Sequence, residues 1–247
     1  MKRRLLAVLA AWRTPLLIAG VFIAALVVRL PASFVTLVVP QEIQLRDVEG
    51  SFWNGRASAI GVGGVLVQEQ VFWNFLPRAL LDAKLAWTVG GQMSGQTSRF
   101  ELALRLGGAE LNAINLALPL EPLAALHPQL KSMPLGAVLR VTAKNLSLNA
   151  RAPVAASVAV EHLFTPLFPQ GELGSYRLDC KGDAEGKGDW QIATVSGVLQ
   201  VMGKGTFDAG QSKVNGQLTL TPQSPIPGLS PLLATLPKAG QGFVLTF

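Results

Sequence analysis

Short runs in which apolar and polar side chains alternate fill this chain from residue 41 onward, and they restrict its fold more than any other feature. A period of two is typical of strands that bury one face of a sheet. The clearest runs are residues 99–106, 138–144, 190–194, 198–202 and 213–220. The pattern therefore predicts a mainly β fold.

Glycines and two short helical segments divide these runs. Gly63–Gly64, Gly90–Gly91 and Gly107–Gly108 stand between strands, where glycine can supply the positive φ of a hairpin turn. We therefore expect an antiparallel, meander-like sheet. Residues 120–131 and 228–236 have helical spacing, which predicts short helices at an open end of the sheet.

The long apolar strand faces of such a sheet need a cover. The sheet must therefore curl into a groove, pack as a sandwich or hold a partner, and the sequence leaves these alternatives open. The proline-containing residues 164–171 could separate two halves of similar build.

The first 31 residues read as a membrane anchor. Residues 16–30 are apolar except for Arg29 and would form a helix of about 22 Å, which snorkelling arginines extend toward the thickness of a bilayer. We predict a basic cytoplasmic tail (1–14), a transmembrane helix (15–31) and a periplasmic β-rich domain (32–247). A cleaved signal peptide is the alternative, but no small-x-small cleavage site follows the apolar run. The expected location is the inner membrane, with a single pass.

The net charge of +6 comes from this N-terminal end. Five of the 21 basic residues precede residue 30, and no acidic residue precedes Glu42. The remaining chain carries 16 basic and 15 acidic residues. Because it has no basic stripe with interleaved aromatic residues, we expect no nucleic-acid partner.

The sequence offers no recognisable catalytic constellation, so we expect a protein that is not an enzyme and binds no cofactor. It has no nucleophile elbow, P-loop, H-E-x-x-H or C-x-x-C motif. The single Cys180 cannot form an intramolecular disulfide, and His127 and His162 lie too far apart in sequence to suggest a metal site. An acidic cluster at residues 179–189 alternates with lysines and is interpreted as a solvated hairpin rather than a calcium site.

The most specific feature is a pair of aromatic segments. Residues 47–57 read D-V-E-G-S-F-W-N-G-R-A, and residues 71–81 read V-F-W-N-F-L-P-R-A-L-L. Each tryptophan can bury a large ring while its indole N–H finds a partner. Gly50, Trp53, Gly55 and Trp73 are therefore candidate residues of either the core or a docking surface.

Both aromatic segments resemble the type II secretion system protein N family, as does the C-terminal pattern of a short L-S-P-L-L-A-T-L helix and a closing strand at residues 240–247. The resemblance covers essentially the whole chain. It implies an accessory inner-membrane component of the machine that exports folded proteins, in contact with the inner-membrane platform and with the secretin. It implies no catalytic residues.

Two functions follow from these observations. In the first, the periplasmic sheet is a scaffold whose edge strands pair with strands of other secretion components. In the second, the sheet is a groove that carries lipid, lined by Leu102, Leu104, Leu139 and Val141.

Overall fold

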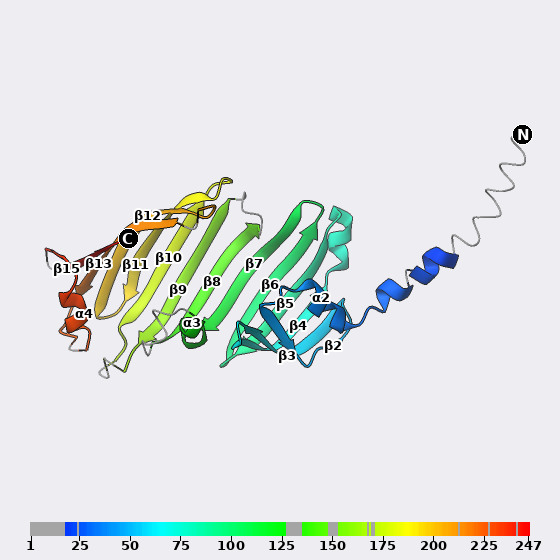
Figure 1. The fold of residues 1–247 in the computed structure, drawn as a ribbon, viewed down its shortest axis with the longest axis horizontal. Coiled ribbons are helices and arrows are strands. Elements are labelled where there is room, and N and C mark those ends of the chain that lie inside the picture. The colour runs from blue at the N-terminus through cyan, green and yellow to red at the C-terminus, as the bar shows by residue number, and fades with distance from the viewer. Residues whose placement is uncertain are drawn as a thin grey trace, which may run out of the picture.

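A single open antiparallel sheet makes up most of the molecule (Figure 1). The computed structural model describes residues 18–23, 25–126, 135–147, 153–166, 168, 171–211, 213–226, 228–240 and 242–247. The sheet has 15 strands in the order β1-β3-β4-β5-β6-β7-β8-β9-β10-β11-β12-β13-β15-β14, and β2 pairs with β3. The predicted mainly β, meander-like architecture is confirmed. The sandwich alternative is wrong, because the described strands form one sheet.

Nearly every strand pairs with its neighbour in sequence, as expected when short turns connect antiparallel strands. The strands are β1 (Ile43–Arg46), β2 (Glu49–Gly50), β3 (Asn54–Val62), β4 (Val65–Phe75), β5 (Leu85–Met93), β6 (Gln96–Arg105), β7 (Gly108–Pro119), β8 (Gly136–Ser147), β9 (Val154–Phe164), β10 (Gly174–Gly182), β11 (Lys187–Ser196), β12 (Leu199–Asp208), β13 (Lys213–Pro222), β14 (Lys238–Ala239) and β15 (Gly242–Thr246). Since β9 and β10 pair directly, the sheet continues across residues 164–171.

Apart from the helical residues at the N-terminus, the described part of the chain contains few helices, and all of these are short. They are η1 (Ala32–Phe34), α2 (Val35–Val38), η2 (Pro77–Asp82), α3 (Leu120–Leu126) and α4 (Ser230–Ala234). The helices expected within residues 120–131 and 228–236 therefore exist. The second half of the first, including His127, lies outside the described residues.

The N-terminal prediction is only partly covered. Residues 18–23 and 25–28 are helical, whereas residues 1–17 and 24 lie outside the described part of the chain. Within the residues that the structure describes, no helix is both long and apolar enough to cross a membrane. The transmembrane helix at 15–31 stays a prediction.

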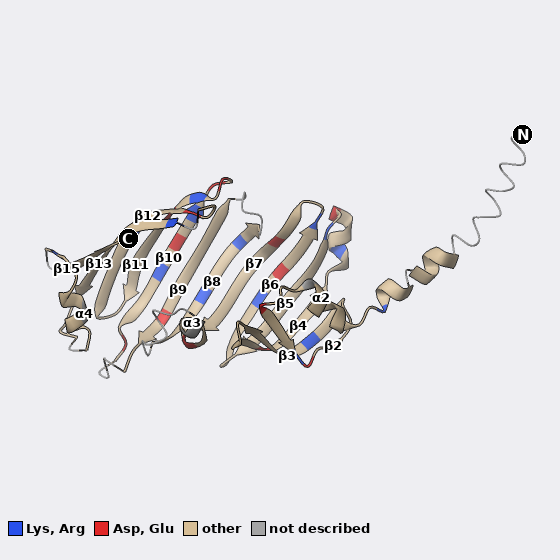
Figure 2. Ribbon diagram, in the orientation of Figure 1, with Lys and Arg blue, Asp and Glu red and all other residues tan. Residues whose placement is uncertain are grey.

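The strand register separates an apolar face of the sheet from a polar one. One row of facing residues runs across seven strands as Val141, Val158, Leu178, Ile192, Gly203, Leu218 and Leu245. The adjacent row, on the opposite face, runs as Thr142, Ser157, Asp179, Gln191, Lys204, Gln217 and Thr246. The polar row includes the charged residues Asp179 and Lys204, and Figure 2 shows where the charged residues occur on the strands. The alternation of apolar and polar residues in the sequence therefore corresponds to the two faces of the sheet.

Glycines within the strands face aromatic rings on the neighbouring strand. Five such pairs lie directly opposite each other in the ladder: Gly55 with Trp73, Gly90 with Phe72, Gly136 with Phe164, Gly188 with Phe207, and Gly205 with Trp190. A Cβ atom at any of these glycines would lie within 3 Å of the opposing ring. The expectation of a turn at Gly90–Gly91 is therefore wrong: both residues lie inside β5, where the absent side chains make room for Phe72 and Gln68.

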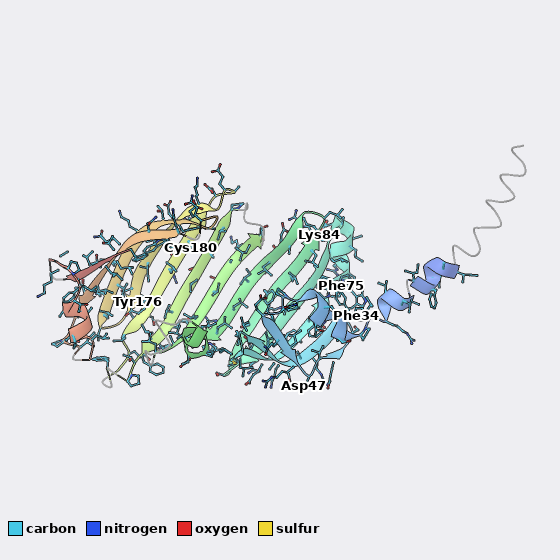
Figure 3. The ribbon with its side chains drawn as sticks, viewed as in Figure 1. Phe34, Asp47, Phe75, Lys84, Tyr176 and Cys180 are labelled. Atoms are coloured by element: carbon cyan, nitrogen blue, oxygen red, sulfur yellow. The ribbon has the colours of Figure 1, made fainter. Side chains whose placement is uncertain are left out.

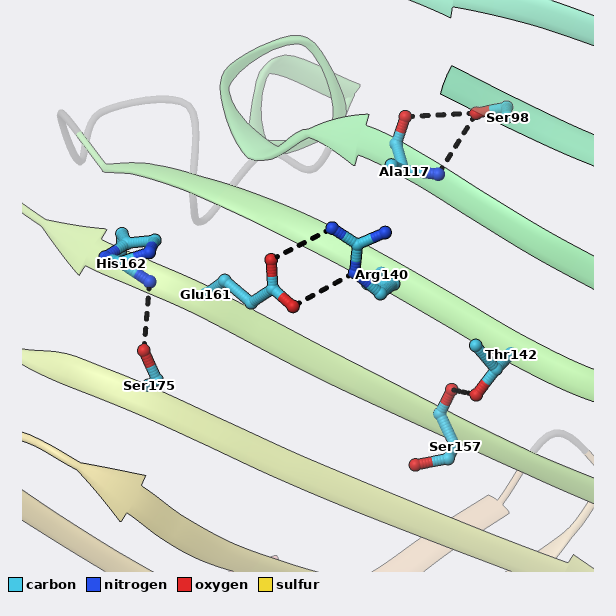
Figure 4. Close-up of polar contacts among 8 residues, drawn as sticks. All are labelled: Ser98, Ala117, Arg140, Thr142, Ser157, Glu161, His162 and Ser175. Atoms are coloured by element: carbon cyan, nitrogen blue, oxygen red, sulfur yellow. Dashed lines mark hydrogen bonds and ion pairs between the residues drawn. The ribbon is translucent and has the colours of Figure 1, made fainter. Parts of the chain in front are cut away.

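Side-chain hydrogen bonds join neighbouring strands in the middle of the sheet (Figure 4). The Ser98 hydroxyl donates to the Ala117 carbonyl (3.1 Å) and accepts the Ala117 N–H (3.0 Å), and Arg140 pairs with Glu161 through two bonds of 3.0 and 3.3 Å. The Ser98 contact lies just beyond a β-bulge at Ala113, which has a φ of 49°. Such bulges bend a strand and increase its twist.

Two cores cover parts of the sheet. The first contains Ala32 of η1 together with Ala57, Val71, Trp73 and Trp87. The second contains Phe168, Leu173, Tyr176, Leu199, Val201 and Ile226. Phe168 follows β9 and Ile226 follows β13. The second core therefore covers the ends of these strands on the side where α4 lies (Figure 1).

Candidate functional site

The first aromatic segment forms the junction between the N-terminal helix and the sheet. Pro31 and Ser51 form an isolated β-bridge, and the Phe52 N–H donates to the Leu30 carbonyl at 2.9 Å. The Trp53 indole Nε1 donates to the Val27 carbonyl at 2.7 Å. The same carbonyl also accepts the Leu30 N–H at 3.3 Å, so the indole adds a second and shorter bond at the end of the helix, from 26 residues away.

Four aromatic rings pack together at this junction. Trp53 stacks on Trp87 with ring centroids 6.2 Å apart and packs edge-on against Phe75 at 4.7 Å. Phe52 meets both tryptophans edge-on, at 5.3 and 5.5 Å. Aromatic pairs at such distances contribute on the order of 1 kcal/mol each beyond the burial of their area. Figure 3 shows Phe75 and Phe34 at the end of the sheet from which the helix leaves.

Trp73 belongs to the first core, next to this cluster. Its side chain is only 6% exposed, and its indole N–H lies 3.2 and 3.1 Å from the Ser51 and Phe52 carbonyls. The ring covers Gly55, where a Cβ atom would be 2.4 Å from Trp73 Cζ2. Trp73 and Gly55 therefore shape the hairpin that presents Trp53.

Gly50 allows the tight turn of the same hairpin. Its φ is +93°, a conformation that side chains rarely adopt, and a Cβ atom there would be 2.7 Å from the Asn54 carbonyl oxygen. The Ser51 hydroxyl accepts the Asn54 N–H at 3.0 Å, which closes the turn. The structure thus brings all four sequence-predicted residues into one unit. Trp73 is a core residue, and Trp53 joins the sheet to the helix.

The apolar face near the C-terminal strands offers a second candidate site. A hollow of about 630 Å³ is lined by Leu178, Cys180, Trp190, Ile192, Leu218 and Phe247 among others. Trp190 stacks on Phe247 with centroids 5.8 Å apart, and its indole N–H donates to the Asn215 carbonyl. Burial raises the pKa of the Cys180 thiol, and Asp179 raises it further. A raised pKa keeps the thiol protonated and lowers its nucleophilicity, and such a surface can hold an apolar ligand.

The predicted groove residues fall in two places. Leu139 and Val141 lie on the apolar face, whereas Leu104 packs against the first core and Leu102 faces Trp87. A broader hollow of about 1720 Å³ spans the strands from β7 to β15. Many of its lining residues belong to the polar face, including Thr142, Ser157 and Gln191.

The acidic cluster at residues 179–189 forms a hairpin. The Asp183 carboxylate accepts hydrogen bonds from the backbone N–H groups of Glu185 and Lys187 at 2.8 and 3.0 Å. Asp183 therefore stabilises the turn of this hairpin. Among the described residues, no group of three or more His, Cys, Asp or Glu side chains could hold a metal ion. His162 instead contacts the Glu172 carboxylate at 2.9 Å.

Sequence reasoning missed the partners of the aromatic residues. Phe52, Phe75 and Trp87 complete the junction, and Val27 receives the indole bond. The alternation of apolar and polar residues in the two strands could have placed Phe75 and Trp87 on the core-facing side, where they lie opposite each other. The bond to Val27 had no signal in the sequence.

One comparison with known proteins identifies a family for this chain. The family model of the type II secretion system (T2SS) protein N matches residues 41–245, which include all strands from β1 to β14 and most of β15. No curated protein and no solved structure matches the chain. Because the matched segment covers most of the sequence, the chain belongs to the type II secretion system protein N family.

Proposed function

We propose that this protein is an accessory component of the type II secretion system, held in the inner membrane by its N-terminal apolar segment. Its sheet lies in the periplasm and acts as a non-catalytic scaffold for other secretion proteins. Family membership over residues 41–245 carries the link to secretion. The junction supports the anchoring, because the Trp53 bond and the aromatic cluster fix the sheet to the end of the apolar helix.

The scaffold role is assigned to the C-terminal edge of the sheet. Gly216 and Phe247 exchange both backbone hydrogen bonds, at 2.9 and 3.2 Å. In an antiparallel ladder the next residue, Thr246, then points its N–H and C=O away from β13. Strand β14 pairs with Gly242 and Phe243, and the Val244 N–H donates to the Pro237 carbonyl at 2.8 Å, so the exposed part of this edge lies at Thr246. A strand from another secretion protein can pair there.

The first experiment tests the link to secretion components. Tagged full-length protein is crosslinked in cells and purified, and its partners are identified by mass spectrometry. Recovery of inner-membrane platform proteins or of the secretin supports the scaffold. Recovery of neither contradicts it.

A pair of variants tests the edge itself. Thr246→Pro removes an outward N–H without touching a bond to β13, whereas Thr246→Val keeps that N–H. The proline variant should lose the crosslinked partner and secrete less exported protein, and the valine variant should behave like the wild type. Normal partner recovery with the proline variant would exclude this edge as the interface.

One observation favours a second function, the carriage of lipid. The hollow beside Trp190 is lined almost entirely by apolar atoms, and acyl chains are the apolar ligands that a membrane supplies. Lipid extraction and mass spectrometry of the purified full-length protein should then recover a bound lipid. Cys180→Met fills part of the hollow and should lower the amount of lipid recovered. An extract free of lipid contradicts this function.

A further inference from the structure

Three leucines project into solvent from two loops of the N-terminal half. Leu80 and Leu81 of η2 are 53% and 89% exposed, and Leu106 in the turn between β6 and β7 is fully exposed. Single exposed leucines are common on protein surfaces. Three on neighbouring loops form an apolar patch that the fold itself does not explain.

The strand register places these loops next to each other. Leu85, which follows η2 at the start of β5, pairs with Leu104 at the end of β6. The turn carrying Leu106 comes two residues later. Both loops therefore lie at the same end of the strands.

The N-terminal helix leaves from this end as well. Phe75 at the end of β4 donates its N–H to the Trp53 carbonyl at 2.7 Å, and the Trp53 side chain binds Val27 of the helix. The segment from Leu76 to η2 follows directly. Figure 1 shows η2 between β4 and β5 at the end of the sheet nearest the helix.

Basic residues flank the leucines in the sequence and end the N-terminal helix. Arg78 lies within η2, Lys84 follows it, Arg105 precedes Leu106, and Arg29 stands at the end of the helix. Lys84 and Arg105 share the Glu110 carboxylate as their partner. Asp82 of η2 and Glu110 add two acidic side chains, which these four basic residues outnumber. An apolar tip with an excess of basic residues matches the interface of a phospholipid bilayer, with acyl chains below a layer of phosphate groups.

We propose that Leu80, Leu81 and Leu106 form a membrane-docking patch that inserts into the bilayer surface beside the N-terminal anchor. The basic side chains then lie at the level of the lipid phosphates. This proposal rests on the proposed anchoring of the N-terminal segment. Helix and patch together hold the sheet at a fixed orientation to the membrane. Insertion also removes the unfavourable free energy of exposing the leucine side chains to water.

Depth-dependent quenching in reconstituted vesicles tests the patch. The full-length protein with Cys180→Ala receives one cysteine through Leu81→Cys, which is labelled with an environment-sensitive fluorophore. The vesicles contain phosphatidylethanolamine and phosphatidylglycerol, with or without spin-labelled acyl chains. Spin-labelled lipid should quench the label by about twofold or more, as expected for a group inserted below the phosphates.

Two further positions make the result decisive. Val195→Cys is a matched control, because Val195 is 63% exposed but lies near the opposite end of the strands; it should show no quenching. Phe22→Cys reports on the helix. Quenching at Phe22 but not at Leu81 would overturn the patch and leave the anchor intact, whereas quenching at neither position would overturn the anchor as well.

Leu106→Cys provides an independent test of the patch on the second loop. It should be quenched like Leu81→Cys. An unquenched label at both leucines would refute membrane docking.

Discussion

Replacing Gly55 with alanine tests whether the glycine–aromatic pairs are structural requirements of the sheet. The new Cβ atom would lie 2.4 Å from Trp73 Cζ2 and 2.7 Å from the Glu49 carbonyl oxygen. Overpacking of this kind costs about 1–3 kcal/mol. The alanine also restricts the unfolded chain, which returns about 0.4–1 kcal/mol. The free energy of unfolding should therefore fall by about 1–2 kcal/mol.

Thermal unfolding of the full-length protein in detergent, followed by tryptophan fluorescence, measures this change. For a chain of this size each kcal/mol corresponds to about 2–4 °C, so Tm should fall by about 2–8 °C. Gly61→Ala in the same strand is the matched control, because its Cβ would have one close neighbour, the Val65 carbonyl oxygen at 3.2 Å. An unchanged Tm for Gly55→Ala, or an equal loss for both variants, would refute the steric reasoning.

Three further predictions follow from single residues. Trp53→Phe removes the indole bond to the helix, worth about 1 kcal/mol, so the Phe52 amide should exchange with solvent about fivefold faster; unchanged exchange would contradict a role in the junction. Burial raises the pKa of Tyr176 to about 12, above an ordinary value of about 10, so this group's contribution to stability is complete below pH 10 and is lost as the pH rises toward 12. The loss, measured by denaturant unfolding, should be smaller in Tyr176→Phe. Cys180, whose pKa burial raises, should react with a maleimide at least about tenfold more slowly than a free cysteine peptide, and equal rates would show that the thiol is exposed.

Period-two alternation was sufficient to predict the class of the fold. The runs at residues 99–106 and 213–220 coincide with β6 and β13, except that Leu106 lies in the turn after β6 and is fully exposed. Alternation is a local signal, since successive side chains of any strand point to opposite faces. It could not show how many sheets the strands form, because that depends on which strands pair.

Other features lay beyond the sequence for identifiable reasons. The glycines of β5 were read as a turn, yet glycine opposite an aromatic residue also provides space, and the two uses look alike in sequence. Gln70, Ala113 and His162 adopt positive φ values inside strands. These residue types rarely adopt that conformation, so the bulges they form had no signal in the sequence.

The candidate site was located but its role was not. The aromatic segments were recognised as the most specific feature, and the structure joins them in one unit. The role of Trp53 follows from its hydrogen bond to the Val27 carbonyl. Val27 belongs to the N-terminal segment, which the sequence marked out only by its hydrophobicity. A contact across 26 residues cannot be derived from the spacing within either segment.

The topology of the sheet suits a scaffold that reaches away from a membrane. The path from β1 to β14 contains 14 strands, and neighbouring strands lie about 4.8 Å apart, so the path is roughly 60 Å long measured along the sheet. The helix joins near the β1 end, whereas Thr246 lies at the other. On the proposed anchoring, a junction that holds one end rigidly therefore carries the pairing edge tens of ångströms along the sheet from the anchor. A loose junction would spread that edge over a wide volume, so in the proposed scaffold the aromatic cluster would contribute to partner binding by fixing the position of the sheet.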